Sequence, residues 1–154
     1  MEIKAFKMDG LGNDFIIIDQ RTNSFDLSKD QIIKICDRTF YGCDQLILIK
    51  KNNNSDADLK FYNSDGSASG ACGNGTRCVA YLLSKEMNKN KIILGTESRN
   101  LESKILKEKL VETKIGSAKT NWNEIPLAEK SNTINLNYKI IDNNNNKHFG
   151  GVAV

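Results

Sequence analysis

Residues 62–83 have the sequence YNSDGSASGACGNGTRCVAYLL, in which two patterns meet. The first part is rich in Gly, Ser, Asn and Asp and is typical of a loop. From Gly73 onward, apolar side chains recur at helical spacing and share one broad face. The sequence therefore predicts a Gly-rich loop that becomes a helix directly after Cys72.

Short apolar runs on both sides of this helix predict strands. They precede it at residues 3–8, 14–19, 44–50 and 58–62, and follow it at 91–97, 101–108, 110–115, 133–142 and 147–154. Ser28 followed by Gln31 is a capping-box pattern that predicts one further short helix. Residues 117–131 are irregular, and the run 151–154 resembles a strand cut in mid-course. We expect an α+β fold in which a mostly antiparallel sheet wraps around the central helix.

Composition limits the classes of partner. The chain has 154 residues, which suits one domain, and its net charge of +3 is small and scattered, so we expect no nucleic-acid partner. No apolar run approaches the roughly 20 residues that span a bilayer. The first residues also lack the apolar core of a signal peptide. We therefore expect a cytoplasmic protein without membrane contacts.

In a reducing compartment the four cysteines, Cys36, Cys43, Cys72 and Cys78, are expected to remain thiols. Their spacing differs from that of zinc ligands, and His148 is the only histidine, so we expect no metal site. Cys36 and Cys78 lie on apolar helix faces and Cys43 follows a turn glycine, which favours packing roles for these three.

Cys72 has a different setting, because it stands where the Gly-rich loop enters the helix. The first amides of a helix lack intrahelical partners and carry the positive end of its dipole. They stabilise a thiolate, which can exchange protons or attack carbon near neutral pH. The same amides could hold a carboxylate. We therefore predict that Cys72 is a reactive thiol that moves a proton on a small substrate.

Other interpretations of this segment are weaker. Cys72 could be an inert residue of a surface turn. A phosphate-binding loop has little support, because neither the Walker pattern nor the dinucleotide-binding glycine pattern is present. A hydrolase would need a histidine partner, and His148 stands beside an Asn-rich turn, where a surface role fits better.

Three motifs, in order and with matching spacing, resemble those of the diaminopimelate epimerases. They are KMDGLGNDF at 7–15, YGCDQL at 41–46, and YNSDGS at 62–67 followed by CGNGTRC at 72–78. The resemblance implies an isomerase without pyridoxal phosphate or any other cofactor, acting in lysine and peptidoglycan precursor synthesis. It interconverts LL- and meso-diaminopimelate: one thiolate removes the α-proton while a thiol on the opposite face delivers another. Cys72 corresponds to the first of these two cysteines.

The resemblance also assigns substrate contacts. Asn13, Gln45 and Asn63 would bind the substrate, and Gly73 and Asn74 would hold its α-carboxylate. Amides directed at that carboxylate would stabilise the enolate-like charge that develops when the weakly acidic α-hydrogen leaves.

Two features depart from the family pattern. Asp9 replaces a histidine in the first motif, and the motifs of the family's second lobe (Gly-Asn-Pro-His, Glu-Arg and a second Cys-Gly-[Ser/Thr]-Gly) are not found in the sequence. Residues 1–154 are therefore expected to form the N-terminal lobe, with the C-terminal lobe of the same enzyme as partner and a homodimer as an open question. Alone, the chain is expected to be inactive. A proline or hydroxyproline racemase-like enzyme and a non-catalytic ligand-binding lobe are the alternatives.

Overall fold

The computed structural model describes residues 3–107, 109–125, 127, 129–133, 137–141 and 147–151. The chain divides into two compact units, residues 1–115 and residues 116–154. The length of the chain suggested one domain, whereas the structure has one larger unit and, after it in the chain, a small one. All the residues singled out for function lie in the first unit.

Within the described residues, the first unit contains eight strands and two helices, and it is an α+β structure as predicted. The elements are β1 (Ala5–Gly10), β2 (Asn13–Asp19), α1 (Lys29–Cys36), β3 (Gln45–Lys50), β4 (Ala57–Asn63), β5 (Ala68–Ser69), α2 (Gly73–Met87), β6 (Lys91–Gly95), β7 (Asn100–Lys107) and β8 (Leu110–Lys114). The sequence missed only the two-residue strand β5, which pairs with β4 inside the segment predicted as a loop.

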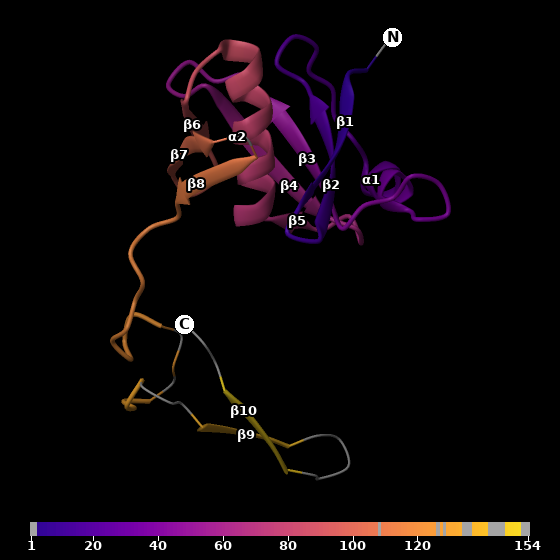
Figure 1. Ribbon diagram of the computed structural model, residues 1–154. Helices are drawn as coiled ribbons and strands as arrows, with labels where there is room; N and C mark the ends of the chain where they lie inside the picture. Colours follow the sequence, from indigo (N-terminus) through magenta and orange to yellow (C-terminus); the bar gives the residue numbers. More distant parts are fainter. Residues whose placement is uncertain are drawn as a thin grey trace. The chain divides into compact units, whose positions relative to one another are not determined.

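The strands form one sheet in the order β1-β2-β3-β4-β6-β7-β8, with β5 on β4. Most neighbours are antiparallel, but β2–β3 and β4–β6 are parallel. Each parallel pair is separated in the chain by a helix, because parallel neighbours need a long crossover connection. The sheet is strongly curved and wraps around α2 (Figure 1), which agrees with the predicted arrangement.

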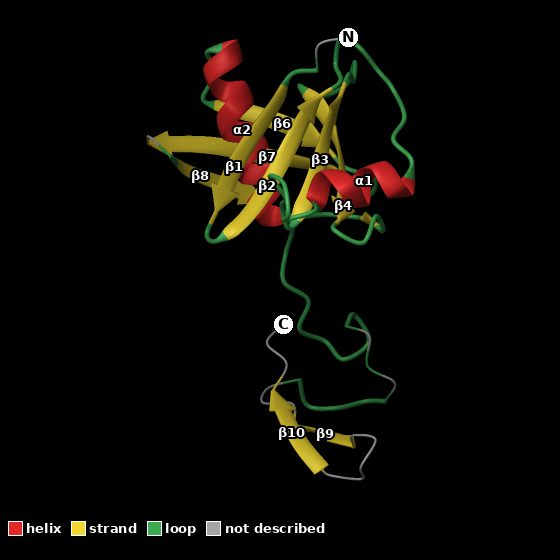
Figure 2. Ribbon diagram, turned by 90° about the vertical axis from the view of Figure 1, so that its right-hand side faces the viewer, coloured by secondary structure: helices red, strands yellow, loops and turns green. Residues whose placement is uncertain are grey.

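The hydrophobic core has two parts, one on each face of the sheet. Figure 2 shows α1 and α2 on opposite faces. On the α2 face, Phe15 and Ile47 pack with Val79 and Leu83 of the helix. On the α1 face, Ile18 and other residues of β2 and β3 pack with Ile32 and Cys36. Since β2 and β3 are covered on both faces, their apolar runs do not alternate with polar residues.

The helix α1 begins with the predicted capping box. The Ser28 hydroxyl accepts a hydrogen bond from the Gln31 amide at 3.3 Å, and the Gln31 side chain accepts one from the Ser28 amide at 2.8 Å. These bonds satisfy two amides that the helix itself leaves unpaired.

Three of the cysteines have the packing roles predicted for them. Cys36, Cys43 and Cys78 are buried, with exposed fractions of 3%, 1% and 6%, and all are free thiols. The Cys43 thiol donates to the Cys36 sulfur at 3.5 Å within the core between α1 and the sheet. Burial raises the pKa of Cys36 to about 12 and that of Cys78 to about 11.

In the second unit, β9 (Asn137–Ile141) and β10 (Lys147–Gly151) pair as an antiparallel hairpin, which confirms that prediction. The described residues of the segment 117–131 form neither helix nor strand, also as predicted. The Asn run expected at the turn and residues 152–154 lie outside the described residues.

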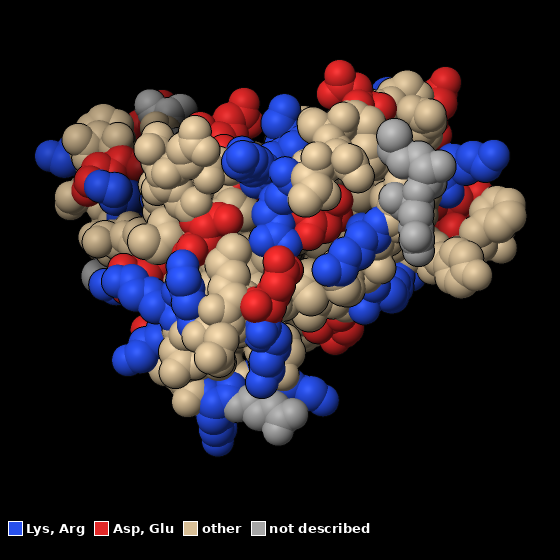
Figure 3. All heavy atoms as spheres, turned by 90° about the horizontal axis from the view of Figure 1, so that it is seen from above, with Lys and Arg blue, Asp and Glu red and all other residues tan. Residues whose placement is uncertain are grey.

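Two further observations concern membrane-spanning helices and surface charge. None of the described helices is both long and apolar enough to pass through a membrane. Basic and acidic side chains are interspersed over the face shown in Figure 3.

Candidate active site

Three of the predicted substrate residues lie at the same end of neighbouring strands. Asn13 opens β2, Gln45 opens β3 and Asn63 closes β4. Gln45 is opposite Phe15 in the parallel pair and opposite Asn63 in the antiparallel pair. The register therefore brings polar side chains that are 50 residues apart in the sequence to one edge of the sheet.

These side chains face the helix α2. Two residues further into each strand lie Phe15, Ile47 and Phe61, and alternate residues of a strand point to the same face. All three pack against Gly75 in the first turn of α2: a Cβ built there would lie 2.7 Å from Ile47 Cδ1, 3.2 Å from Phe61 and 3.3 Å from Phe15. The polar edge thus lies beside the start of the helix.

Cys72 is the N-cap of that helix. Its backbone is extended (φ −146°, ψ 109°), its sulfur accepts the Gly75 amide at 3.4 Å, and its carbonyl accepts the Thr76 amide at 2.8 Å. Among the described hydrogen bonds, the amides of Gly73 and Asn74 are the donors of the first turn that remain without an acceptor. The helix start therefore offers two amide donors beside a partly exposed thiol.

The Cys72 thiol contacts one of the predicted substrate residues directly. Its sulfur donates to Asn13 Oδ1 at 3.7 Å. The Asn13 side chain in turn donates through Nδ2 to Asp44 Oδ2 at 2.9 Å. The thiol thus lies between a backbone donor in the helix and an amide acceptor from the sheet edge.

The other predicted residues form separate contacts. Gln45 Nε2 donates to Asn63 Oδ1 at 2.9 Å, and Asn63 Nδ2 donates to Ser67 Oγ at 3.0 Å. The Asn74 side chain accepts from the Arg77 guanidinium on the next turn. In the described residues no hydrogen bond joins the Gln45–Asn63 pair to Cys72. Of the predicted substrate residues on the sheet edge, Asn13 is therefore the one that contacts the thiol.

The sequence missed an ionic cluster at this edge. Asp14 Oδ1 and Asp44 Oδ1 each accept from the Arg38 guanidinium at 2.7 Å, and Lys7 donates to Asp14 Oδ2 at the same distance. The bond from Arg38 holds the pKa of Asp14 well below its usual range, and the bond from Asn13 lowers the pKa of Asp44. Asp14 and Asp44 could have been singled out from the sequence, because they stand next to Asn13 and Gln45 in the quoted motifs. Arg38 lies outside these motifs, and no sequence pattern pointed to it.

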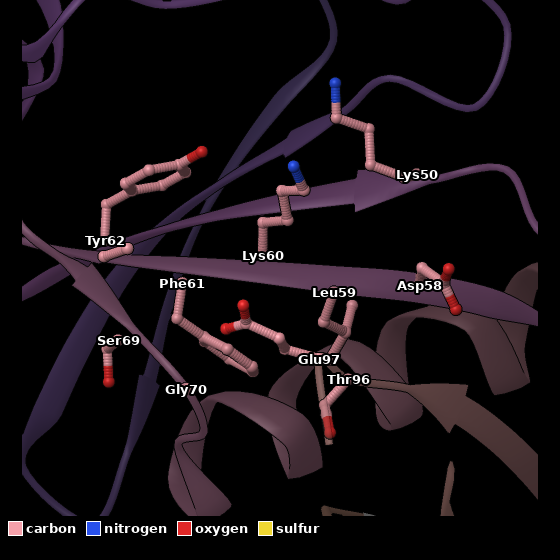
Figure 4. Close-up of a pocket in the computed structure, with 11 residues that line it drawn as sticks. Lys50, Asp58, Leu59, Lys60, Phe61, Tyr62, Ser69, Gly70, Thr96 and Glu97 are labelled. Atoms are coloured by element: carbon pink, nitrogen blue, oxygen red, sulfur yellow. The ribbon is translucent and has the colours of Figure 1, made fainter. Parts of the chain in front are cut away.

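Two hollows lie near this region without including Cys72. One, of about 400 Å³, is lined by residues such as Lys60, Tyr62, Gly70 and Glu97 (Figure 4). It lies beside β4, between the residues of β4 that pair with β6 and those that pair with β5. The other, of about 810 Å³, lies between β1, α2 and β8 and includes Asp9, Asn74, Arg77 and Cys78. The second hollow borders the candidate site through Asn74.

The fold is similar to that of two solved structures. A phenazine biosynthesis protein of the PhzF family from Enterococcus faecalis has a similar fold, with a TM-score of 0.54 and 14% sequence identity over 68% of this chain and 40% of its own. A putative phenazine biosynthesis PhzC/PhzF protein from Clostridium difficile is similar at a TM-score of 0.52 and 19% identity, covering 67% of this chain and 40% of its own.

Comparison of the sequence with known proteins identifies the family. The family model described as diaminopimelate epimerase matches residues 5–121. A diaminopimelate epimerase of Pelagibacter ubique is 67% identical over all of this chain and 56% of its own length, and one of Phenylobacterium zucineum is 43% identical over 82% of this chain and 46% of its own. The chain belongs to the diaminopimelate epimerase family. It spans about half the length of these curated relatives.

Proposed function

We propose that this chain is the N-terminal lobe of an isomerase that interconverts LL- and meso-diaminopimelate. The observation that carries the proposal is the position of Cys72 at the start of α2, with its sulfur bonded to both the Gly75 amide and Asn13. The relatives are named for this activity, and the motif residues lie together at one edge of the sheet.

The reaction is a two-base proton exchange. A thiolate on one face of the substrate takes the α-proton, the C–H electron pair is held as an enolate-like charge on the α-carboxylate, and a thiol on the other face returns a proton to the carbon. One sulfur gains the proton that the other loses, so no redox cofactor is needed. We assign Cys72 as one of these two groups, acting as an acid–base group and not as a covalent nucleophile.

The start of α2 supplies the electrostatic part of this reaction. The amides of Gly73 and Asn74 point out of a helix N-terminus, where the dipole favours negative charge. We propose that they bind the α-carboxylate and stabilise the charge that develops on it. Asn13, Gln45 and Asn63 would position the rest of the substrate at the sheet edge.

The second base is proposed to come from a C-terminal lobe that follows this one in the full-length protein. Large apolar side chains are exposed around the site: Leu11 in the turn between β1 and β2 is 87% exposed, and Phe40 and Tyr41 before β3 are 71% and 91% exposed. Such side chains fit a surface that a second lobe covers.

The test uses the full-length protein in deuterated water with LL-diaminopimelate. We expect α-deuteration and formation of the meso isomer, and we expect the Cys72→Ala variant to lose both. Hydroxyproline serves as the control substrate and should not exchange. Full activity of the Cys72→Ala variant would contradict the proposal.

A second measurement tests the division into lobes. The 154-residue chain alone should show no turnover, because it supplies only one of the two bases. Robust epimerisation by the purified chain would show that the second base does not come from another lobe.

A further inference from the structure

The orientation of the Asn13 amide is fixed by its partner. A carboxylate can only accept hydrogen bonds, so the end of the Asn13 side chain that faces Asp44 must be the Nδ2 donor. The opposite end, Oδ1, then faces the Cys72 sulfur at 3.7 Å. The carboxylate of Asp44 therefore decides which end of the amide meets the thiol.

Asp44 is itself held in place by three bonds. Its Oδ2 also accepts the Asp14 amide at 3.0 Å, and its Oδ1 accepts the Arg38 guanidinium at 2.7 Å. Its own amide donates to Asp14 Oδ1 at 2.9 Å. Both oxygens of the carboxylate are thus occupied, and its rotation away from Asn13 would break bonds at both.

The amide end that meets the sulfur matters for the state of the thiol. An amide oxygen accepts the S–H proton and repels a thiolate, whereas an amide N–H would bond to the thiolate and favour it. The Gly75 amide already donates to the same sulfur. The Asn13 oxygen opposes that contact.

We propose that Asp44 is a positioning residue, which turns the Asn13 oxygen toward Cys72 and so favours the proton-donating thiol over the thiolate. The inference rests on the proposed function, in which Cys72 transfers protons. Its test measures the thiol and not epimerisation, so the two can fail separately.

Other titratable or charged groups near the thiol are kept in every variant. Cys78 on α2 interacts electrostatically with three groups: Cys72, Arg77 on the same helix and Asp9 on β1. Lys7, Asp14 and Arg38 belong to the ionic cluster around Asp44. Every variant below keeps these groups, and Asp44→Asn removes only the charge of Asp44, whose direct effect on the thiol the Asn13→Ala background detects.

The experiment follows the alkylation rate of Cys72 by iodoacetamide against pH in the 154-residue chain. Mass spectrometry of tryptic peptides separates Cys72 from Cys78, because Arg77 lies between them. With Asp44→Asn, the new side chain can donate to Asn13, so the Asn13 amide can turn its N–H toward the sulfur. We expect the midpoint of the pH profile to fall by about half to one pH unit, the effect of one hydrogen bond.

The double variant shows whether Asp44 acts through Asn13. In an Asn13→Ala background, Asp44→Asn should no longer move the midpoint. An equal shift in both backgrounds would mean that the Asp44 charge acts on the thiol directly, and no shift in either would mean that it does not act at all; each result overturns the proposal. Asp56→Asn is the matched control, since Asp56 bonds Lys89 and the Ile93 amide instead.

A measurement on the unaltered chain covers the case in which Asp44→Asn fails to fold. The Asn13 side-chain NH₂ should exchange its hydrogen with solvent at least about tenfold more slowly than that of the exposed Asn53, because one of its protons is bonded to a carboxylate. Equal exchange at the two side chains would overturn the proposal.

Discussion

Asp14 and Asp44 each accept the backbone amide of the other: the Asp44 amide lies 2.9 Å from Asp14 Oδ1, and the Asp14 amide lies 3.0 Å from Asp44 Oδ2. The two residues stand at the starts of the parallel strands β2 and β3. Arg38 bonds both carboxylates, so the pair and its guanidinium fasten the edge of the sheet that carries Asn13 and Gln45. We call these three residues the aspartate clamp.

The aspartate clamp should weaken in acid. Because the pKa of Asp14 is lowered in the folded chain, its stabilisation is present above its ordinary value of 3.8 and is lost as the pH falls below it. We expect Asp14→Asn to lower the free energy of unfolding by about 1–2 kcal/mol at pH 7. The difference in the free energy of unfolding between this variant and the unaltered chain should become smaller toward pH 2.

Urea unfolding at pH 7, 4 and 2 measures this prediction. Asp26→Asn, which removes an exposed carboxylate, is the control and should change the free energy of unfolding little at any of these pH values. A deficit for Asp14→Asn that is the same at pH 7 and pH 2 would contradict the assignment.

Gly75 should not tolerate a side chain. A methyl group there would meet the side chains of Ile47, Phe61 and Phe15, all of which are buried. We expect Gly75→Ala to cost about 1–3 kcal/mol by overpacking. Gly73→Ala is the matched control, because only the Arg77 side chain lies near its position, at 3.7 Å, and thermal unfolding should show little loss. Equal stability of the two variants would show that α2 can shift on the sheet.

Cys72 should react with an alkylating reagent before the other three thiols. Cys72 is partly exposed, whereas Cys78 and Cys36 are buried and their pKa values are raised to about 11 and about 12. At pH 8 we expect iodoacetamide to modify Cys72 at least about tenfold faster than the other three. Peptide mapping during the reaction checks this, with urea-unfolded chain as the reference in which all four react alike. Faster modification of Cys78 would mean that the start of α2 opens.

The capping box of α1 should contribute measurably to stability. Ser28→Ala removes the side chain that accepts the Gln31 amide, and we expect a loss of about 1 kcal/mol in urea unfolding. Gln31→Ala removes the reciprocal bond and should cost less, because the Ser28 cap remains. A neutral effect of Ser28→Ala would show that water satisfies this helix start equally well.

The local features of the chain were determined by the sequence. The spacing of apolar residues predicted every described strand except β5, together with both helices. Ser28 and Gln31 marked the start of α1, and the glycines after Cys72 marked the start of α2. The motifs were sufficient to identify the family that the comparisons then established. Each of these signals lies within a few neighbouring residues, where backbone preferences and capping act.

Only the tertiary structure decided how these pieces meet. The parallel pairing of β2 with β3 and of β4 with β6 depends on how α1 and α2 cross the sheet. The contacts of Asn13 with Cys72 and with Asp44 join residues 59 and 31 positions apart. No local pattern specifies such partners, because they are selected by strand register and by the packing of α2 against Phe15, Ile47 and Phe61. The sequence therefore predicted Cys72 as the reactive thiol, and the fold supplied the neighbours that lie against it.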